Sequence, residues 1–164
     1  MLTNCIYLED ASVTIEGIKF YGTPWTNSRK NIREEGFKIP ISDVEKWEEV
    51  CSSIPSDTDI LVSHCPPLGI QDLNSHGQMC GSESLLKHVV ERIKPRYHIF
   101  GHIHEGKNFS LEESTSSSNV AKCLAYGVVT NGTTTFANAS ACIKTPSGKV
   151  PKNPPIVFDL QRTE

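Results

Sequence analysis

The sequence lacks a basic surplus, a long apolar run and any closely spaced cysteine pair. Its 164 residues carry a formal net charge of −3, so a basic surface for nucleic acid or an anionic membrane is not expected. No run of about 18 apolar residues is present, which argues against a transmembrane helix. The six cysteines include no C-x-x-C pair, and no secretory signal is read at the amino terminus. We therefore expect a cytoplasmic protein with reduced thiols.

The length predicts a single domain over residues 1–164. A chain of this size can bury roughly 70% of its unfolded surface, enough for a true core. The hydrophobic fraction of 37% is slightly low for a globular domain even after glycine is added, which indicates a polar segment. The serine- and glutamate-rich residues 107–122 are the best candidate, and we interpret them as a flexible insertion.

The first part of the chain predicts a β-hairpin followed by a helix. Residues 13–15 and 18–21 are rich in β-branched and aromatic side chains, with Glu16-Gly17 as a turn between them, and residues 5–8 form a further short apolar run. Ser42, with Glu45 three residues later, is the expected N-cap of a helix over residues 43–52.

Two helix and strand segments then end in polar loops. An apolar strand over residues 59–63 runs into His64. After it, Ser82 is expected to cap a helix with helical apolar spacing up to Ile93, and residues 97–100 form the next strand. This alternation predicts a mixed α/β sheet. Residues 133–136 and 156–158 are expected as late strands, joined by a linker over residues 144–155.

Histidines follow both of these strands. His64 ends the first, and the sequence Gly101-His102-Ile103-His104 directly follows the second. Polar loops after the strands of an α/β sheet are the usual place for ligands. Imidazole suits Zn, Fe and Mn ions, and the flanking Gly101 permits close backbone approach. A hydrogen-bonded surface histidine is the alternative for each, and a structural role is the expected one for the remaining histidines, His76, His88 and His98.

Other side chains near these positions are weaker candidates for a role at the histidine site. Cys65 is expected to be a packed thiol rather than a second ligand beside His64. Asp72 and Glu105 could orient an imidazole by accepting a hydrogen bond from its N–H group, although solvated surface carboxylates are favoured for both. Tyr21 and Trp25 are expected to be core or groove-lining residues.

With these residues in place, the sequence resembles the calcineurin-like metallophosphoesterases, and among them the metallophosphoesterase-domain branch. The resemblance covers nearly the whole chain. It rests on His64 with its Pro-Pro-Leu-Gly loop, on the histidine-rich loop from Gly101 to Gly106, and on four further segments, residues 2–8, 21–25, 138–140 and 153–160.

The resemblance implies a fold, a site and a reaction. The fold would be part of a four-layer α/β/β/α sandwich with mixed sheets. His64 and His102 would ligate one divalent transition metal (Mn, Fe or Zn) and His104 a second. The chemistry would be hydrolysis of phosphomonoesters or phosphodiesters, with cyclic nucleotides among the substrates, and two metals would activate a water.

The sequence departs from the family pattern on the aspartate side of the site. The family motifs D-x-H, G-D-x-x-D and G-N-H have no match, because no glycine precedes aspartate or asparagine and no aspartate precedes histidine by two positions. We therefore expect only the carboxyl-terminal half of the family domain and at most one bound metal. Two alternatives stay open, a non-catalytic interaction protein that self-associates through exposed strand edges and a mononuclear tris-histidine module.

Overall fold

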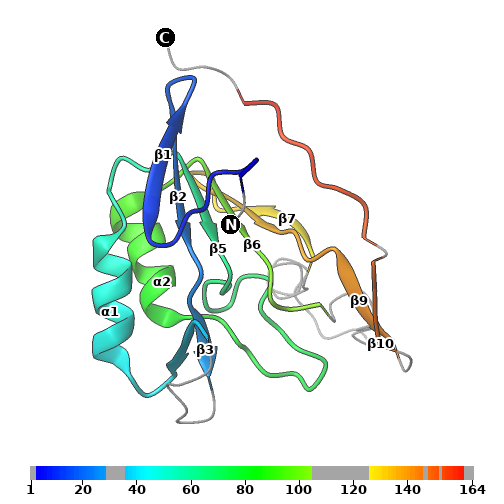
Figure 1. Ribbon diagram of the computed structural model, residues 1–164. Coiled ribbons are helices and arrows are strands. Elements are labelled where there is room, and N and C mark those ends of the chain that lie inside the picture. Colours follow the sequence, from blue (N-terminus) through cyan, green and yellow to red (C-terminus); the bar gives the residue numbers. More distant parts are fainter. Residues whose placement is uncertain (1–2, 29–35, 105–125, 146–147, 152, 161–164) are drawn as a thin grey trace.

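The structure is a computed structural model that describes residues 3–28, 36–104, 126–145, 148–151 and 153–160 (Figure 1). Its elements, in chain order, are β1 (Ala11–Ile15), β2 (Ile18–Thr23), β3 (Thr26–Ser28), β4 (Lys38–Pro40), α1 (Val44–Ser53), β5 (Ile60–Ser63), α2 (Glu83–His88), the π-helix η1 (Val89–Ile93), β6 (Tyr97–Phe100), β7 (Gly127–Thr130), β8 (Thr135–Asn138), β9 (Cys142–Thr145) and β10 (Gly148–Pro151).

A six-stranded mixed sheet with the order β1-β2-β5-β6-β8-β7 forms the centre of the fold. The four inner strands β2, β5, β6 and β8 are parallel, and β1 and β7 pair antiparallel at the two edges. The predicted mixed α/β sheet is confirmed. Because the inner strands are parallel, the loops that follow β5, β6 and β8 leave the sheet at the same edge.

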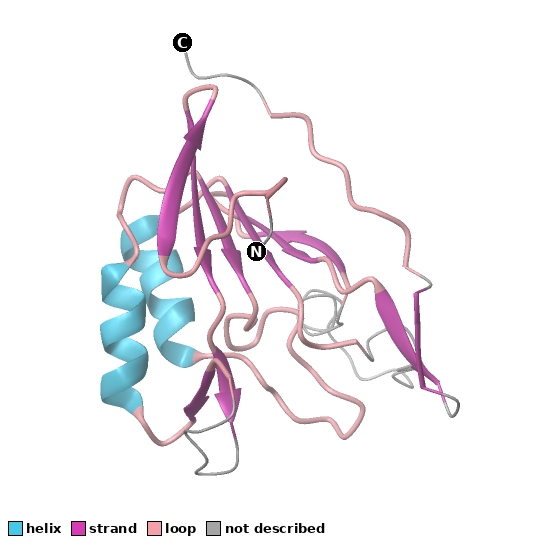
Figure 2. Ribbon diagram, in the orientation of Figure 1, coloured by secondary structure: helices cyan, strands magenta, loops and turns pink. Residues whose placement is uncertain are grey.

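Both α-helices cover one face of this sheet (Figure 2). The residues that the sheet turns toward them lie in one cross-strand row, Tyr21, Leu61, His98, Phe136 and Val129. Trp47, Val50 and Cys51 of α1 and Leu85 of α2 complete the same buried cluster. For the second helix, the apolar spacing in the sequence therefore marked the buried face.

The helix starts follow the capping rules with one shift. The side chain of Ser82 accepts a hydrogen bond from the Leu85 amide, as predicted. The first helix is capped by Asp43, whose carboxylate accepts from the Lys46 amide, and not by Ser42. A carboxylate here also interacts favourably with the positive end of the helix dipole.

Several strand predictions were wrong. Residues 5–8 form no strand, and the expected strand at residues 156–158 is extended chain without sheet pairing, since Pro154 and Pro155 offer no amide hydrogen to a neighbour. The late strand at 133–136 begins and ends two residues later, as β8. The expected linker at 144–155 contains most of the antiparallel pair β9 and β10. The expected insertion at 107–122 lies outside the described residues.

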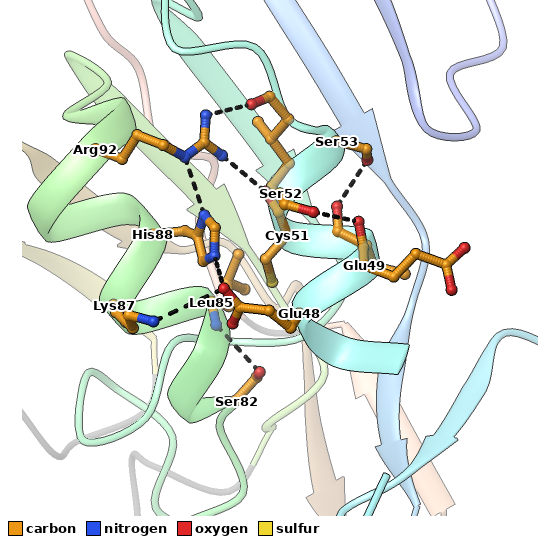
Figure 3. A network of polar contacts seen from close by, with 12 residues as sticks. Glu48, Glu49, Cys51, Ser52, Ser53, Ser82, Leu85, Lys87, His88 and Arg92 are labelled. Atoms are coloured by element: carbon orange, nitrogen blue, oxygen red, sulfur yellow. Dashed lines mark hydrogen bonds and ion pairs between the residues drawn. The ribbon is translucent and has the colours of Figure 1, made fainter. Parts of the chain in front are cut away.

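A polar network joins the two helices (Figure 3). Arg92 donates to the carbonyl oxygens of Cys51 and Ile54 at the end of α1, at 2.8 Å each. Its Nε donates to His88 Nδ1 at 3.0 Å, so His88 carries its proton on Nε2 and donates it to Glu48 at 2.8 Å. The hydrogen bond from His88 lowers the pKa of Glu48.

We expect Arg92→Ala to lower the free energy of unfolding by about 1–2 kcal/mol, because two helix-terminal carbonyls lose a charged donor. Urea denaturation measures this effect. Lys87→Ala is the control, since the 3.7 Å ion pair of Lys87 with Glu48 is exposed and such pairs contribute little. Equal stability of Arg92→Ala and the parent chain would show that the network does not stabilise the helix pair.

Candidate metal centre

His64 and His102 follow two neighbouring parallel strands, β5 and β6. The backbone of His64 is fixed on both sides: its amide donates to Thr23 O of β2 at 3.1 Å, and its carbonyl accepts from the Gly101 amide at 3.4 Å. The strand arrangement thus places the two histidine-bearing turns next to each other at one edge of the sheet.

The two imidazoles meet directly. His102 Nδ1 lies 3.0 Å from His64 Nε2, and the ring centroids are 4.9 Å apart at an interplanar angle of 71°. Metal–imidazole bonds are about 2.0–2.1 Å long, so two nitrogens at adjacent positions on one ion lie about 3 Å apart. The 3.0 Å contact is a hydrogen bond between the two rings, and its length also fits the spacing of two ligands on a single divalent metal.

The turn that carries His102 is strained. His102 itself has φ +70°, a conformation that costs a non-glycine residue of order 1 kcal/mol or more. We expected Gly101 to be the residue with the unusual backbone conformation, whereas the positive φ lies one residue later, at His102. The Ile103 amide donates to Gly101 O at 2.8 Å and closes the turn around His102.

His104 faces a different partner. Its Nδ1 donates to Cys142 O at 3.0 Å, which fixes the tautomer and leaves the lone pair on Nε2, as in histidines that bind metals through Nε2. Within the described part of the chain, no three histidine, cysteine or acidic side chains gather closely enough to hold one metal. The tris-histidine arrangement is therefore not formed here, and the assignment of His104 to a second metal remains a prediction.

The other histidines lie away from this pair. His98 is fully buried in β6 and forms a 2.8 Å hydrogen bond with Ser63 Oγ. Burial lowers the pKa of His98 to about 3, so the ring is neutral. His88 belongs to the helix network, and His76 is exposed in the loop between β5 and α2.

Cys65 is a packed thiol. It is fully buried, and burial raises its pKa to about 12. Its burial matches the packed role expected from the sequence. None of the five cysteines among the described residues forms a disulfide, whereas Cys123 lies outside them.

Asp72 takes neither of the two roles considered for it, the favoured one of a solvated surface carboxylate or that of a group that orients an imidazole. Among the described residues, its carboxylate accepts from the Gly81 amide at 2.9 Å and makes no hydrogen bond to His64, His102 or His104. It is also fully buried rather than solvated, because residues 66–82 fold back on themselves and the amide of Gly81 requires an internal acceptor. Glu105 lies outside the described residues.

Tyr21 and Trp25 occupy the expected positions, Tyr21 in the core and Trp25 packed against it. The supporting residues that the sequence reasoning missed are Ser63, Gln71 and Asn138. Asn138 ends β8, and a polar residue at the end of a buried strand was the available signal for it. The segment 138–140 had been noted only as part of the family resemblance.

Comparison with known proteins supports the same family. The model of the calcineurin-like phosphoesterase family matches residues 4–106. Metallophosphoesterase domain-containing protein 1 of Homo sapiens is 41% identical over 163 residues, which are 98% of this chain and 41% of that protein. A UPF0046 protein of Caenorhabditis elegans is 35% identical over 162 residues, 98% of this chain and 34% of its own length.

A solved crystal structure shares the fold at 16% identity, with a TM-score of 0.50, and the match covers 81% of this chain and 45% of that one. The chain thus spans about two fifths of the length of the human relative it matches. None of the described helices is long and apolar enough to cross a membrane. From the family match and these relatives, the chain belongs to the calcineurin-like phosphoesterase family, in its metallophosphoesterase-domain branch.

Proposed function

We propose that this chain supplies the histidine side of a metal-dependent phosphoesterase site, with phosphomonoesters or phosphodiesters, including cyclic nucleotides, as substrates. The observation that supports it is the 3.0 Å approach of His64 Nε2 and His102 Nδ1. His64 and His102 would hold the ion, a divalent Mn, Fe or Zn, and His104 would offer Nε2 to the second metal of the complete family site. When bound, such an ion lowers the pKa of a water ligand and stabilises charge on phosphoryl oxygens.

The contribution of the chain itself is to hold neutral imidazoles in place. The Thr23 carbonyl and the Gly101 amide fix the backbone of His64, and the Cys142 carbonyl fixes the tautomer of His104. Ligands held in this way lose little conformational freedom when a metal binds. This is the preorganisation that a metal-dependent hydrolase requires.

The motifs of the aspartate side of the family site, G-D-x-x-D and G-N-H, have no match in the sequence. Two cations a few ångströms apart repel strongly without an anionic bridge, so we propose that this chain holds one metal at most. Since the chain spans 41% of its human relative, the complete two-metal site belongs to the longer proteins in this proposal.

A hydrolysis assay tests the proposal. We expect the 164-residue chain to cleave bis(4-nitrophenyl) phosphate faster with Mn²⁺ than in a metal-free control. His102→Ala is expected to lower this rate at least about tenfold, because it removes one of the two histidine ligands. His76→Ala, an exposed histidine outside the site, is the matched control. Cleavage that is equal with and without metal, or unchanged by His102→Ala, would refute the proposed activity.

A partner-binding role is the second candidate, and the sheet face opposite the helices favours it. That face carries Phe20, Tyr97 and Ile99, all half-buried, and Val62 and Val128, which are 39% and 47% exposed. Phe158 packs on Tyr97 at a centroid distance of 4.7 Å, so the exposed part of this face lies at Val62 and Val128. Exposed apolar side chains that lie together mark association sites. The expectation is self-association of the purified chain by light scattering, reversed by the Val62→Lys, Val128→Lys double variant. A monomeric parent chain at high concentration would exclude it.

A further inference from the structure

Asn138 is fully buried at the end of β8 and uses its whole side chain in hydrogen bonds. Its Nδ2 donates to Gln71 O at 3.0 Å and to Ile103 O at 3.3 Å, and its Oδ1 accepts from the Ser140 amide at 3.0 Å. Its own backbone amide donates to Gln71 Oε1 at 3.1 Å. A buried amide with both donors satisfied by carbonyls holds those carbonyls firmly, because the alternative is an unpaired buried group.

The two carbonyls belong to the two loops of the histidine pair. Gln71 lies in the loop that starts at His64, and Ile103 stands between His102 and His104. Both loops are conformationally strained, with φ +51° at Gln71 and φ +70° at His102. Strained residues of this kind persist only where surrounding contacts over-determine them.

The chain after Asn138 supports the same turn at two further points. The Ala139 amide donates to Phe100 O at 2.7 Å, just before Gly101. Cys142 O accepts from His104 Nδ1 at 3.0 Å. The turn from Gly101 to His104 is thus held at its start, middle and end by residues 138–142.

We propose that Asn138 is the positioning residue of the histidine pair: its amide ties the loop of His64 to the turn of His102 and so sets the approach of their ring nitrogens. The expected effect on metal affinity rests on the proposed function, whereas the geometric role of Asn138 does not. Outer groups that orient metal ligands typically change metal affinity 10- to 100-fold when removed.

The test compares Asn138→Ala with Arg92→Ala. Each variant removes a side chain that donates two hydrogen bonds to two backbone carbonyls, but Arg92 acts between the helices. In the metal-free 164-residue protein, we expect the NOE between the ring protons of His64 and His102 to be lost in Asn138→Ala and kept in Arg92→Ala. In a competition titration, Zn²⁺ affinity is expected to fall about 10- to 100-fold only in Asn138→Ala.

Asn138→Ser provides a second variant if Asn138→Ala does not fold, because it keeps a polar side chain at this position but removes the Nδ2 donor to Gln71 O and Ile103 O, and it is expected to weaken the same NOE. The positioning role would be overturned if the folded variant kept the NOE of the parent protein. It would also be overturned if Arg92→Ala lost the NOE to the same extent. Absence of zinc binding in the parent chain would instead refute the proposed function, and the metal-free NOE comparison would still decide the role of Asn138.

Discussion

Acidification from pH 6.5 to pH 3 is expected to cost the fold up to about 5 kcal/mol through His98 alone. Burial lowers the pKa of folded His98 to about 3, whereas an unfolded histidine titrates near 6.5. Between these values the unfolded chain binds a proton that the folded chain does not. Stability therefore falls by about 1.4 kcal/mol for each pH unit.

The contribution is complete above pH 6.5 and is lost progressively on the way down to about pH 3. A loss of this size approaches the entire stability of a typical domain. The physical cause is the surrounding core: His98 lies 5.1 Å from the ring of Phe100 and 5.9 Å from that of Phe136, measured between centroids. Its hydrogen bond with Ser63 Oγ satisfies only the Nε2 atom, and Nδ1 has no hydrogen-bond partner among the described residues.

Urea denaturation at several pH values between 7 and 4 measures the effect. His98→Gln removes the titrating group and is expected to flatten the dependence of unfolding free energy on pH. His76→Gln, at an exposed loop position, is expected to leave the slope unchanged. If His98→Gln and the parent chain showed the same slope, the acid sensitivity would arise elsewhere.

Gly81→Ala is expected to lower the free energy of unfolding by about 3 kcal/mol. A Cβ atom at this position would lie 2.5 Å from the carbonyl carbon and oxygen of Pro67 and 2.6 Å from Leu68 N. These are backbone atoms held by the bonds of Ser82 N to Pro66 O and Leu68 N to Ser82 O, at 3.0 Å each. The loop must therefore open to admit the methyl group.

Gly77→Ala is the matched control in the same loop. Gly77 has φ +71° and nothing within 4 Å of a Cβ atom, so alanine there carries only the backbone cost of about 1 kcal/mol. Thermal and urea unfolding of both variants separate the steric effect from the conformational one. Equal losses in the two variants would contradict the close approach of Gly81 to Pro67.

Local pattern was sufficient for the central part of the secondary structure. The β1–β2 hairpin, both helices and the strands before His64 and Gly101 follow from periodicity and capping residues, because these signals act within a few positions. The pair β9–β10 was missed, since lysine, proline and glycine in residues 144–155 resemble a linker. The sequence analysis did not predict that the second helix ends in the π-helix η1.

The sequence analysis named the two histidines that lie together, but not the residues that support them. Two histidines after two parallel strands must emerge at one sheet edge, so the meeting of His64 and His102 was foreseeable. The amide of Asn138 reaches Gln71 across 67 positions of the sequence. Such a contact depends on the completed sheet order, which local patterns do not specify.

Metal stoichiometry of the purified chain tests the central claim most directly. The 164-residue protein would be loaded with Mn²⁺ or Zn²⁺, dialysed extensively and measured by elemental analysis beside a His64→Ala, His102→Ala double variant. The account predicts about one metal per parent chain and almost none in the double variant. No retained metal in the parent chain, or equal metal in both proteins, would contradict it.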